Sequence, residues 1–387
     1  MDGIYLDHNA TTPTAPEVLA AMLPYFGECF GNPSSVHAAG RETRGALDEA
    51  RRSVAELVGA SPDEIVFTSG GTESDNLALR GIMSRAATRG RNTLVISAIE
   101  HPAVLRAAES LAREGTALVT LPVDIEGVVR PADLKNALAE HAAGLVSIMT
   151  ANNETGSVQP VAELAAVCRS AGVPFHTDAV QAAGKVELAF AGEGIDLLSV
   201  SAHKFYGPKG VGALAVRRGL RLAPTSAGGR QEKGRRAGTE NVPALVGMGA
   251  AARLALRELS SEPARLEGLK RHLWQAMRER IPGCHLNGTL DRTLPSTLNV
   301  SFEGVDGEAL ILGLDLERIF VSSASACSSG AVEPSHVLTA MGRDFDLARS
   351  SVRISLGRGN DLPQMDATLE ALVRVVTRIR SMAGAVA

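Results

Sequence analysis

Short runs of β-branched and apolar residues alternate with amphipathic segments between about residue 60 and residue 217. The apolar runs have the length of buried strands. Segments 102–115 and 161–172 instead repeat apolar residues at every third and fourth position and end in glycine, which is typical of helices. Strands that alternate with such helices predict a mostly parallel sheet with helices on both faces. The predicted strands are residues 64–68, 93–97, 117–122, 144–150, 173–178, 196–201 and 210–216.

The pattern changes from about residue 260 onward. A long helical segment precedes a strand at residues 297–302, and the chain ends in another helical run. We therefore expect a large α/β domain over residues 15–259. A smaller α+β domain is expected from residues 1–14 together with 260–387.

Composition narrows the classes of function that fit this fold. The chain has 387 residues, and 39 basic against 43 acidic residues give a formal net charge of -4. No basic stripe predicts a nucleic-acid surface, and no apolar stretch has the roughly 18 residues of a membrane span. The N-terminus lacks the basic and apolar regions of a signal peptide, so we expect a cytoplasmic protein that acts on small molecules.

The segment "FTSGGTESDN" at residues 67–76 joins a predicted strand to a predicted helix through two glycines. Glycine lets backbone N–H groups approach an anion, Thr72 adds a hydroxyl, and the helix start carries the positive end of the helix dipole. These features predict a phosphate-binding turn that includes Gly71. The alternative is a capped helix after a tight turn, with "TESD" as the cap.

A carboxylate and an amine follow two further predicted strands. Asp178 ends the strand at 173–178, and Lys204 follows the strand at 196–201, close to Ser201 and His203. An isolated Asp at a strand end more often caps the next helix. A carboxylate, an amine and a phosphate-binding turn at one sheet edge together favour pyridoxal phosphate, which forms a Schiff base with a lysine and needs an acid at its pyridine nitrogen.

His101 and Asn153 also come just after predicted strands, and both have a plainer explanation. A single histidine there is more often a hydrogen-bonded structural residue, although an imidazole over a pyridine ring can stack and exchange protons. Asn152 and Asn153 are also typical turn residues.

The four cysteines, Cys29, Cys168, Cys284 and Cys327, are far apart and form no CxxC pair, so neither a disulfide framework nor a zinc site is predicted. Most cysteines are buried and inert, as we expect of Cys168. Cys327 lies in a run of small residues that bury little surface, which favours an accessible nucleophile on a mobile arm.

Taken together, these segments resemble the cysteine desulfurases, in particular the long-loop, NifS/IscS-like class that supplies sulfur for iron–sulfur clusters. The resemblance covers nearly the whole chain. It rests on "YLDHNATTP" at 5–13, "FGNPSSVH" at 30–37, "FTSGGTESDN", "IEHPAV", "NNETGSVQP", "HTDAVQAAGK", "SAHKFYGPKG", "GGRQEKGRRAGTEN", "SSASACSSGAVEPSHVL" and "SSVRISLGR".

The resemblance implies a pyridoxal-phosphate-dependent enzyme of fold type I that acts as a homodimer and passes sulfur to an acceptor or iron–sulfur scaffold protein. By position, Lys204 would form the Schiff base, Asp178 would pair with the pyridinium, and Cys327 would be the nucleophile. By the same resemblance, His101 would stack on the cofactor ring, Gln181 would bind the ring hydroxyl, and Arg353 would bind the substrate carboxylate. Asn153 would contact the cofactor or the substrate, and Thr239 would bind the phosphate of the cofactor in the partner subunit. The residues that would bind the cofactor phosphate within one subunit are Gly71, Thr72, Ser201 and His203.

The implied reaction converts L-cysteine to L-alanine and leaves a persulfide on Cys327. One departure from the family pattern is Gly71, where alanine is usual, and we expect it only to loosen the turn. Two alternatives stay open: a selenocysteine lyase or another class V aminotransferase, and a sulfur-relay protein without catalysis. The long segment around Cys327 disfavours the first, and the intact set of Lys204, Asp178 and His101 disfavours the second.

Overall fold

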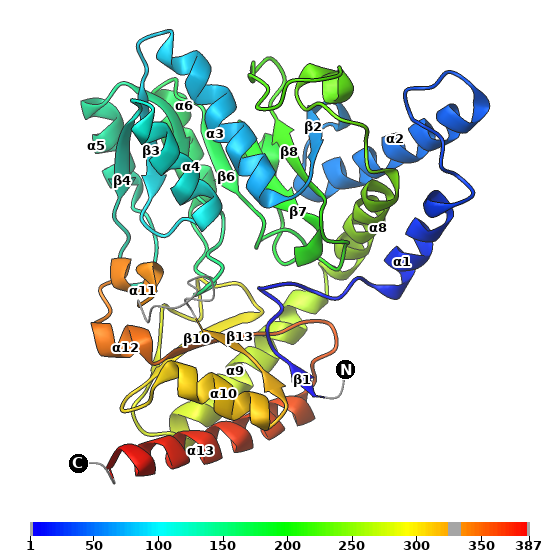
Figure 1. The fold of residues 1–387 in the computed structure, drawn as a ribbon. Coiled ribbons are helices and arrows are strands. Elements are labelled where there is room, and N and C mark those ends of the chain that lie inside the picture. Colours follow the sequence, from blue (N-terminus) through cyan, green and yellow to red (C-terminus); the bar gives the residue numbers. More distant parts are fainter. Residues whose placement is uncertain (1–2, 324–333, 385–387) are drawn as a thin grey trace.

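A seven-stranded sheet organises the first part of the chain in the computed structural model, which describes residues 3–323 and 334–384 (Figure 1). The strand order is β2-β8-β7-β6-β5-β3-β4. All neighbouring pairs are parallel except the two that involve β8, which confirms the predicted mostly parallel sheet. The strands are β2 (Ile65–Thr68), β3 (Thr93–Ser97), β4 (Ala117–Leu121), β5 (Ala143–Ser147), β6 (Phe175–Asp178), β7 (Leu197–Ser201) and β8 (Gly212–Val216).

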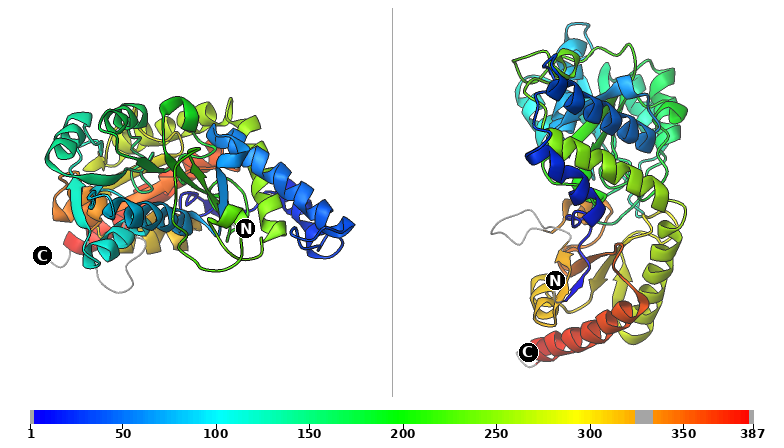
Figure 2. Two further views of the ribbon diagram at one scale, coloured as in Figure 1. Left: turned by 90° about the horizontal axis from the view of Figure 1, so that it is seen from above. Right: turned by 90° about the vertical axis from the view of Figure 1, so that its right-hand side faces the viewer.

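Helices cover both faces of this sheet, and the side chains of each strand alternate between two cores. In β3, Leu94 and Ile96 join one core while Val95 joins the other, as the two-residue period of a strand requires. Figure 2 shows the two layers from above. The first core contains α3 (Gly71–Ala87) and α4 (Pro102–Arg113), and the second contains α2 (Ala38–Val58), α5 (Pro131–Glu140), α6 (Val161–Ser170) and α8 (Val242–Glu258).

Two glycines allow the turn between β2 and α3 to lie close to the sheet. Gly70 has a φ of +154°, a conformation that residues with a Cβ rarely adopt. A Cβ on Gly212 of the neighbouring strand would lie 2.7 Å from the Cα of Gly70. The close approach therefore depends on glycine at both positions, and it places the start of α3 at the sheet edge.

A second, smaller sheet lies below the large one, with its own buried core (Figures 1 and 2). It is antiparallel with the order β12-β13-β10-β9, and β1 pairs with β11 beside it. Its elements are β1 (Ile4–Tyr5), α9 (Glu262–Arg280), β9 (Cys284–Leu286), β10 (Thr297–Phe302), α10 (Gly307–Leu316), β11 (Ile319–Phe320), β12 (Ser322–Ser323), β13 (Ser351–Ser355) and α13 (Leu362–Gly384). This separate core supports the predicted domain division at about residue 260, which stays a prediction.

The N-terminal segment connects the small sheet to the edge of the large one. The backbone N–H of Asn9 donates to Ser355 Oγ at 2.9 Å, and Thr12 N donates to the carbonyl of His203 at 2.9 Å. The remaining helices are α1 (Pro16–Met22), α7 (Phe190–Glu193), α11 (His336–Ala340) and α12 (Phe345–Arg349). Within the described residues, none of the helices combines the length and apolar character needed to cross a membrane.

Candidate active site

The carboxyl ends of the parallel strands meet at one edge of the large sheet, and we call this edge the rim. Most of the predicted cofactor residues follow these strand ends: Gly71 and Thr72 after β2, His101 after β3, Asn153 after β5, Asp178 at the end of β6, and Ser201, His203 and Lys204 at the end of β7. Ligands of open α/β sheets bind beyond the carboxyl ends of the strands. The rim is therefore the candidate active site.

Lys204 ends a short 3-10 turn that follows β7. Its Nζ donates to the backbone carbonyl of Ala10 at 2.8 Å and to that of Asn9. These contacts hold the amine at the boundary between the rim and the N-terminal segment. The lysine is thus directed into the rim.

Asp178 is 5% exposed, and its Oδ1 accepts the N–H of Val180 at 2.8 Å. Burial raises the pKa of the Asp178 carboxyl, while the charges of His101 and Lys204 oppose that rise. The three titratable groups therefore lie within electrostatic range of one another. The bond to Val180 fulfils the turn role that an isolated Asp takes, and the predicted role of Asp178 toward the pyridine nitrogen stays a prediction.

His101 is the N-cap of α4, where its Nδ1 accepts the N–H of Ala103 at 3.1 Å. A neutral ring that accepts at Nδ1 carries its proton on Nε2. Burial lowers the pKa of His101, and the nearby Lys204 and His336 lower it further, whereas Asp178 raises it. The N-cap role of His101 is therefore confirmed, and its neutral imidazole presents an Nε2–H that leaves the predicted role toward the cofactor open as a prediction.

The phosphate-binding prediction falls at the first turn of α3, where N–H groups have no acceptor inside the helix. Thr72 is exposed there and, together with His101, lines a cavity of about 380 Å³ between α3 and α4. Ser201 faces this turn, because a Cβ on Gly70 would lie 3.7 Å from its Oγ. His203 follows Ser201 by two residues, and its Nδ1 forms a hydrogen bond with Thr11 Oγ1 of the N-terminal segment at 3.1 Å.

The structure gives a steric reason for glycine at position 71, which the sequence did not reveal. A Cβ on Gly71 would lie 2.8 Å from Cγ2 of Val180, the residue that holds Asp178. Alanine at this position would therefore push on the segment that carries the carboxylate. Glycine is therefore favoured here because a Cβ would contact Val180, in addition to its effect on the flexibility of the turn.

Arg353 reaches the rim from β13 of the small sheet. Its Nη2 pairs with Asp7 Oδ1 at 2.6 Å, and its Nη1 donates to the carbonyl of Asn153 at 3.0 Å. Its Nε is buried and has no hydrogen-bond partner among the described residues. The predicted carboxylate-binding guanidinium is thus at the rim, with two of its nitrogens already in use.

Asn152 and Asn153, which are both typical turn residues in the sequence, form different contacts in the structure. The Oδ1 of Asn152 accepts the N–H groups of Glu154 and Thr155 at 2.8 and 3.0 Å, and its Nδ2 donates to Ile99 O. Asn152 therefore builds the turn. No side-chain hydrogen bond of Asn153 occurs within residues 3–323 and 334–384, which leaves its amide available to the rim.

Asn9 and Lys185 are rim residues to which sequence reasoning assigned no role. The side chain of Gln181 donates from Nε2 to Asn9 O at 2.9 Å, and its Oε1 accepts from Lys185 Nζ at 3.0 Å. Because an ammonium can only donate, Lys185 fixes which end of the Gln181 amide is the oxygen. Both residues stand inside the motifs "YLDHNATTP" and "HTDAVQAAGK", but neither strand position nor periodicity marks them.

A buried polar layer lies behind the rim and was also missed. His176 in β6 is fully buried between Ser147 Oγ at 2.8 Å and Ser199 Oγ at 3.0 Å, with Asp75 Oδ1 3.6 Å away. Glu100 accepts Met149 N at 2.9 Å through Oε1. Burial raises the pKa of Glu100 to about 8 and that of Asp75 well above its usual value, and Asp178 raises both further.

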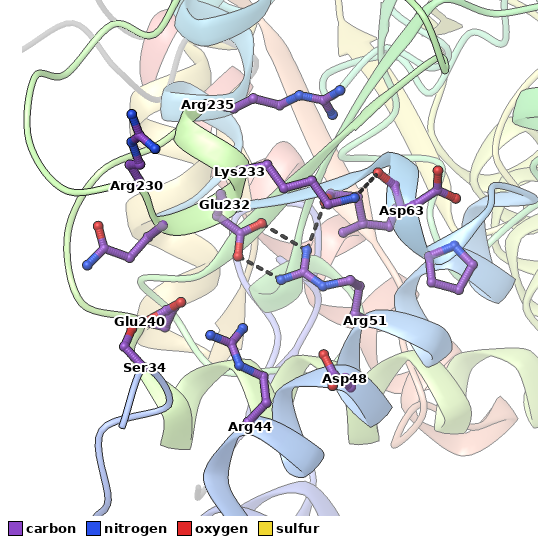
Figure 3. Close-up of a pocket in the computed structure, with 13 residues that line it drawn as sticks. Ser34, Arg44, Asp48, Arg51, Asp63, Arg230, Glu232, Lys233, Arg235 and Glu240 are labelled. Atoms are coloured by element: carbon purple, nitrogen blue, oxygen red, sulfur yellow. Dashed lines mark hydrogen bonds and ion pairs between the residues drawn. The ribbon is translucent and has the colours of Figure 1, made fainter. Parts of the chain in front are cut away.

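Thr239 lies outside the rim residues described above, in the segment after the 3-10 turn Gln231–Gly234. It is exposed, and the preceding part of this segment lines a cavity of about 570 Å³ (Figure 3). There Arg51 forms a two-point ion pair with Glu232 at 2.7 and 2.8 Å. The predicted role of Thr239 toward a partner's phosphate stays a prediction.

Cys327 lies outside the described residues, whereas the other three cysteines are described. Cys168 is fully buried, as expected, and burial raises its pKa to about 12. Burial likewise raises the pKa of Cys284 to about 12, and a hydrogen bond to Glu42 raises that of Cys29. None of these three thiols is therefore activated as a thiolate.

Comparison with known proteins agrees with the fold and the rim. The family model described as class V aminotransferase matches residues 4–367. A protein named cysteine desulfurase IscS from Dictyoglomus turgidum is 46% identical over 379 residues, covering 98% of this chain and 96% of its own. The chain therefore belongs to the class V aminotransferase family and, within it, to the cysteine desulfurases.

Two solved structures have the same fold as this chain over most of its length. One titled NIFS-like protein is 37% identical, has a TM-score of 0.91, and is matched over 97% of this chain and 100% of its own. Another, titled SspA in complex with cysteine, is 35% identical with a TM-score of 0.81 and is matched over 91% of this chain and 98% of its own. These likenesses confirm the predicted α/β fold of the pyridoxal-phosphate-dependent enzymes.

The rim fits pyridoxal phosphate, the cofactor of this family. The cofactor needs an amine for its aldehyde, a carboxylate for its pyridine nitrogen and donors for its phosphate. Lys204 and Asp178 supply the first two within electrostatic range of each other. The glycine turn at the start of α3 opens beside Ser201, so N–H and hydroxyl donors converge where no Cβ intervenes.

Proposed function

We propose that this chain is a cysteine desulfurase that converts L-cysteine to L-alanine and leaves the sulfur as a persulfide on Cys327. The observation that carries the proposal is the electrostatic interaction of Lys204, Asp178 and His101, which lie at or after the carboxyl ends of β7, β6 and β3 at one edge of the sheet. Buried titratable groups that shift one another's pKa values at one site favour a functional site. The cysteine complex of a related structure supports the choice of substrate.

When bound, pyridoxal phosphate supplies an electron-accepting ring that stabilises negative charge at the α-carbon of an amino acid. The Asp178 carboxylate would hold the proton on the pyridine nitrogen. Lys204 Nζ would hold the cofactor before the substrate arrives and move the α-proton afterwards. Neutral His101 would cover the ring and exchange a proton through Nε2.

Substrate binding falls to Arg353 and Asn153. A planar guanidinium binds a carboxylate through paired N–H groups. In Arg353, Nη2 is held by Asp7 and Nε is the buried donor without a partner in the described part of the chain. The carboxylate of L-cysteine would therefore bind at Nε and share or replace the contact with Asp7.

Sulfur transfer needs a thiolate, and the properties of the other cysteines support Cys327 for this role. Its thiolate would attack the sulfur of the substrate, so that an S–S bond forms while the C–S bond breaks. The substrate carbon takes up a proton and leaves as L-alanine, and Cys327 keeps the persulfide. The three described cysteines have raised pKa values and are poor nucleophiles at neutral pH.

The remaining parts of the proposal concern partners. A homodimer would bring Thr239 of one protomer toward the phosphate of its partner, and the exposure of Thr239 supports such a contact. A sulfur acceptor or an iron–sulfur scaffold protein would take the persulfide sulfur. A cytoplasmic location remains a prediction from the sequence.

The experiment that tests the proposed function follows both products. The wild-type protein loaded with pyridoxal phosphate should form alanine and reductant-released sulfide from L-cysteine in equal amounts. Cys327→Ser should keep the visible absorption of the bound cofactor and lose sulfide release, and the matched control Cys29→Ser should change neither. Sulfide release by Cys327→Ser at the wild-type rate would contradict the persulfide step.

Comparison of L-cysteine with L-selenocysteine tests the first alternative. A cysteine desulfurase should lose turnover of L-cysteine in Cys327→Ser, whereas a selenocysteine lyase should turn over L-selenocysteine far faster than L-cysteine in the wild type. The second alternative, a relay protein without catalysis, requires that no alanine forms.

A further inference from the structure

Lys185 places a second amine at the rim, and the proposed mechanism gives it no task. Its Nζ donates to Asn9 Oδ1 at 3.0 Å and to Gln181 Oε1 at 3.0 Å. Both acceptors are neutral amide oxygens, and Lys185 takes part in no ion pair within residues 3–323 and 334–384. An amine in such a setting is not charge-compensated, which is costly for its protonated form.

Asn9 brings this amine next to Lys204. Its backbone oxygen accepts from Lys204 Nζ and from Gln181 Nε2, while its side-chain oxygen accepts from Lys185 Nζ. Because both oxygens belong to one residue, the two amines are close neighbours. The side-chain amide of Asn9 is itself fixed by its bond to Thr297 Oγ1 at 2.9 Å, so the arrangement is held from the small sheet.

The charged and titratable groups around Lys185 come from three segments: the end of β7, β13 and the N-terminal segment. Burial lowers the pKa of Lys185 to about 7, and the charges of Lys204 and Arg353 lower it further. Arg353 is already paired with Asp7. Burial and the charge of Lys185 lower the pKa of His8 to about 4, so His8 is neutral near pH 7. Lys204 is therefore the charge with which Lys185 competes.

An amine attacks an aldehyde only through its lone pair. On the proposed function, the neutral Nζ of Lys204 forms a C=N bond with the aldehyde carbon of pyridoxal phosphate, and the aldehyde oxygen leaves as water with the two amine protons. A lysine that kept its proton at neutral pH would do this slowly. Enzymes solve the problem by desolvation or by a second cationic group beside the reactive lysine.

We propose that Lys185 and Lys204 are a coupled pair of amines that share one positive charge near neutral pH, with Lys185 as the positioning residue that keeps Lys204 able to attack the cofactor aldehyde. Two titratable sites that interact by more than about one pK unit release their protons as a pair. The inference deepens the proposed function and rests on it.

The test measures uptake of pyridoxal phosphate by the apoprotein, which does not depend on turnover. The second-order rate of uptake is followed by visible absorption across a pH series for the wild type, Lys185→Met, Lys185→Arg and Lys209→Met. In Lys185→Met the repelling charge is gone, so the midpoint of the rate profile should rise by about one pH unit or more, which makes uptake at about pH 7 roughly tenfold slower.

The two other variants are matched controls. Lys185→Arg keeps a positive charge and a hydrogen-bond donor, so its midpoint should stay at or below that of the wild type. Lys209 is an exposed lysine five residues after Lys204, and Lys209→Met should leave the midpoint unchanged. An unchanged midpoint in Lys185→Met would overturn the proposal, as would a rate lowered by the same factor at every pH, because that result indicates structural support only.

The two proposals fail in different ways. Normal uptake by the wild type without alanine formation from L-cysteine would contradict the proposed function and leave the amine pair intact. Normal desulfuration together with superimposable uptake profiles of the wild type and Lys185→Met would contradict the amine pair alone.

Discussion

The rim and the cavity of Figure 3 are both rich in charged residues, but these residues differ in how they are paired and buried. The cavity is the larger of the two hollows described above, about 570 Å³ against about 380 Å³ at the rim. In the cavity, Arg51 is bound by both carboxylate oxygens of Glu232, and the lining residue Asp63 pairs at 2.9 Å with Arg218, which does not itself line the cavity. These two ion pairs match opposite charges, although Arg235 Nη1 and Glu240 Oε2 in the lining have no hydrogen-bond partner among the described residues.

At the rim, Arg353 is also paired with Asp7, but other buried groups of like charge lie close enough to shift one another's pKa values. Lys185 lies beside Lys204, and the buried carboxyls of Asp75 and Glu100 lie in the field of Asp178. Such an arrangement destabilises the fold, so it persists where function requires it. The comparison teaches that cavity size does not identify the reactive site, whereas buried titratable groups that shift one another's pKa values beyond the carboxyl ends of parallel strands do.

The largest expected effect comes from removing the central charge of the rim. Asp178→Asn keeps the acceptor for the N–H of Val180 but can no longer hold a proton on the pyridine nitrogen by charge. We expect turnover of L-cysteine to fall on the order of 10²–10³-fold, the usual cost of losing a charge-stabilising group. The measurement is kcat at saturating L-cysteine, with cofactor content checked by absorption.

A smaller effect is expected on stability behind the rim. Burial raises the pKa of Glu100 from 4.5 to about 8, so the folded chain holds a proton that the unfolded chain releases within this window. The free energy of unfolding therefore falls as the pH rises from about 4.5 to about 8, by roughly 1.4 kcal/mol per pH unit from this group. Glu100→Gln cannot titrate and should escape this loss.

Urea unfolding of the apoprotein at about pH 5 and about pH 8 measures the difference. The stability of Glu100→Gln relative to the wild type should be greater at the higher pH. Parallel pH dependences of the two proteins would show that Glu100 does not retain its proton in the folded chain.

The smallest effect is expected in the cavity, where the lining residues Arg51 and Asp63 have ion-pair partners. Glu232→Gln leaves Arg51 without its counter-charge and should lower the free energy of unfolding by about 1–3 kcal/mol, while the rim keeps its absorption and turnover. Asp63→Asn in the exposed pair with Arg218 is the matched control and should change stability within experimental error. A large loss of turnover in Glu232→Gln without loss of cofactor would break the contrast between the two regions.

The sequence predicted the framework of the rim well because that framework is repetitive. Each of the predicted strands of the large sheet is present, and 93–97 and 297–302 agree with β3 and β10 at both ends. Parallel strands bring their carboxyl ends to one edge, so Asp178 and Lys204 could be paired across 26 positions of sequence. The short strands β1, β11 and β12 were not predicted, because two-residue strands have no periodicity.

What the sequence could not provide is the side-chain packing that gives rim residues their partners. Asn9 acts through its backbone oxygen as much as its side chain, and no residue pattern records that use. Lys185 follows Gln181 by four positions, and no sequence pattern indicates that its amine lies between two amide oxygens. Asn152 and Asn153 are chemically identical neighbours, and only the turn geometry separates their roles.

The central claim is that the amine of Lys204 carries the cofactor, and borohydride reduction of the loaded protein tests it most directly. Reduction fixes the cofactor to the nitrogen that holds it, and peptide mass spectrometry then identifies the modified lysine. We predict the phosphopyridoxyl group on Lys204. Its appearance on Lys185 or Lys209, or on no lysine at all, would contradict the account.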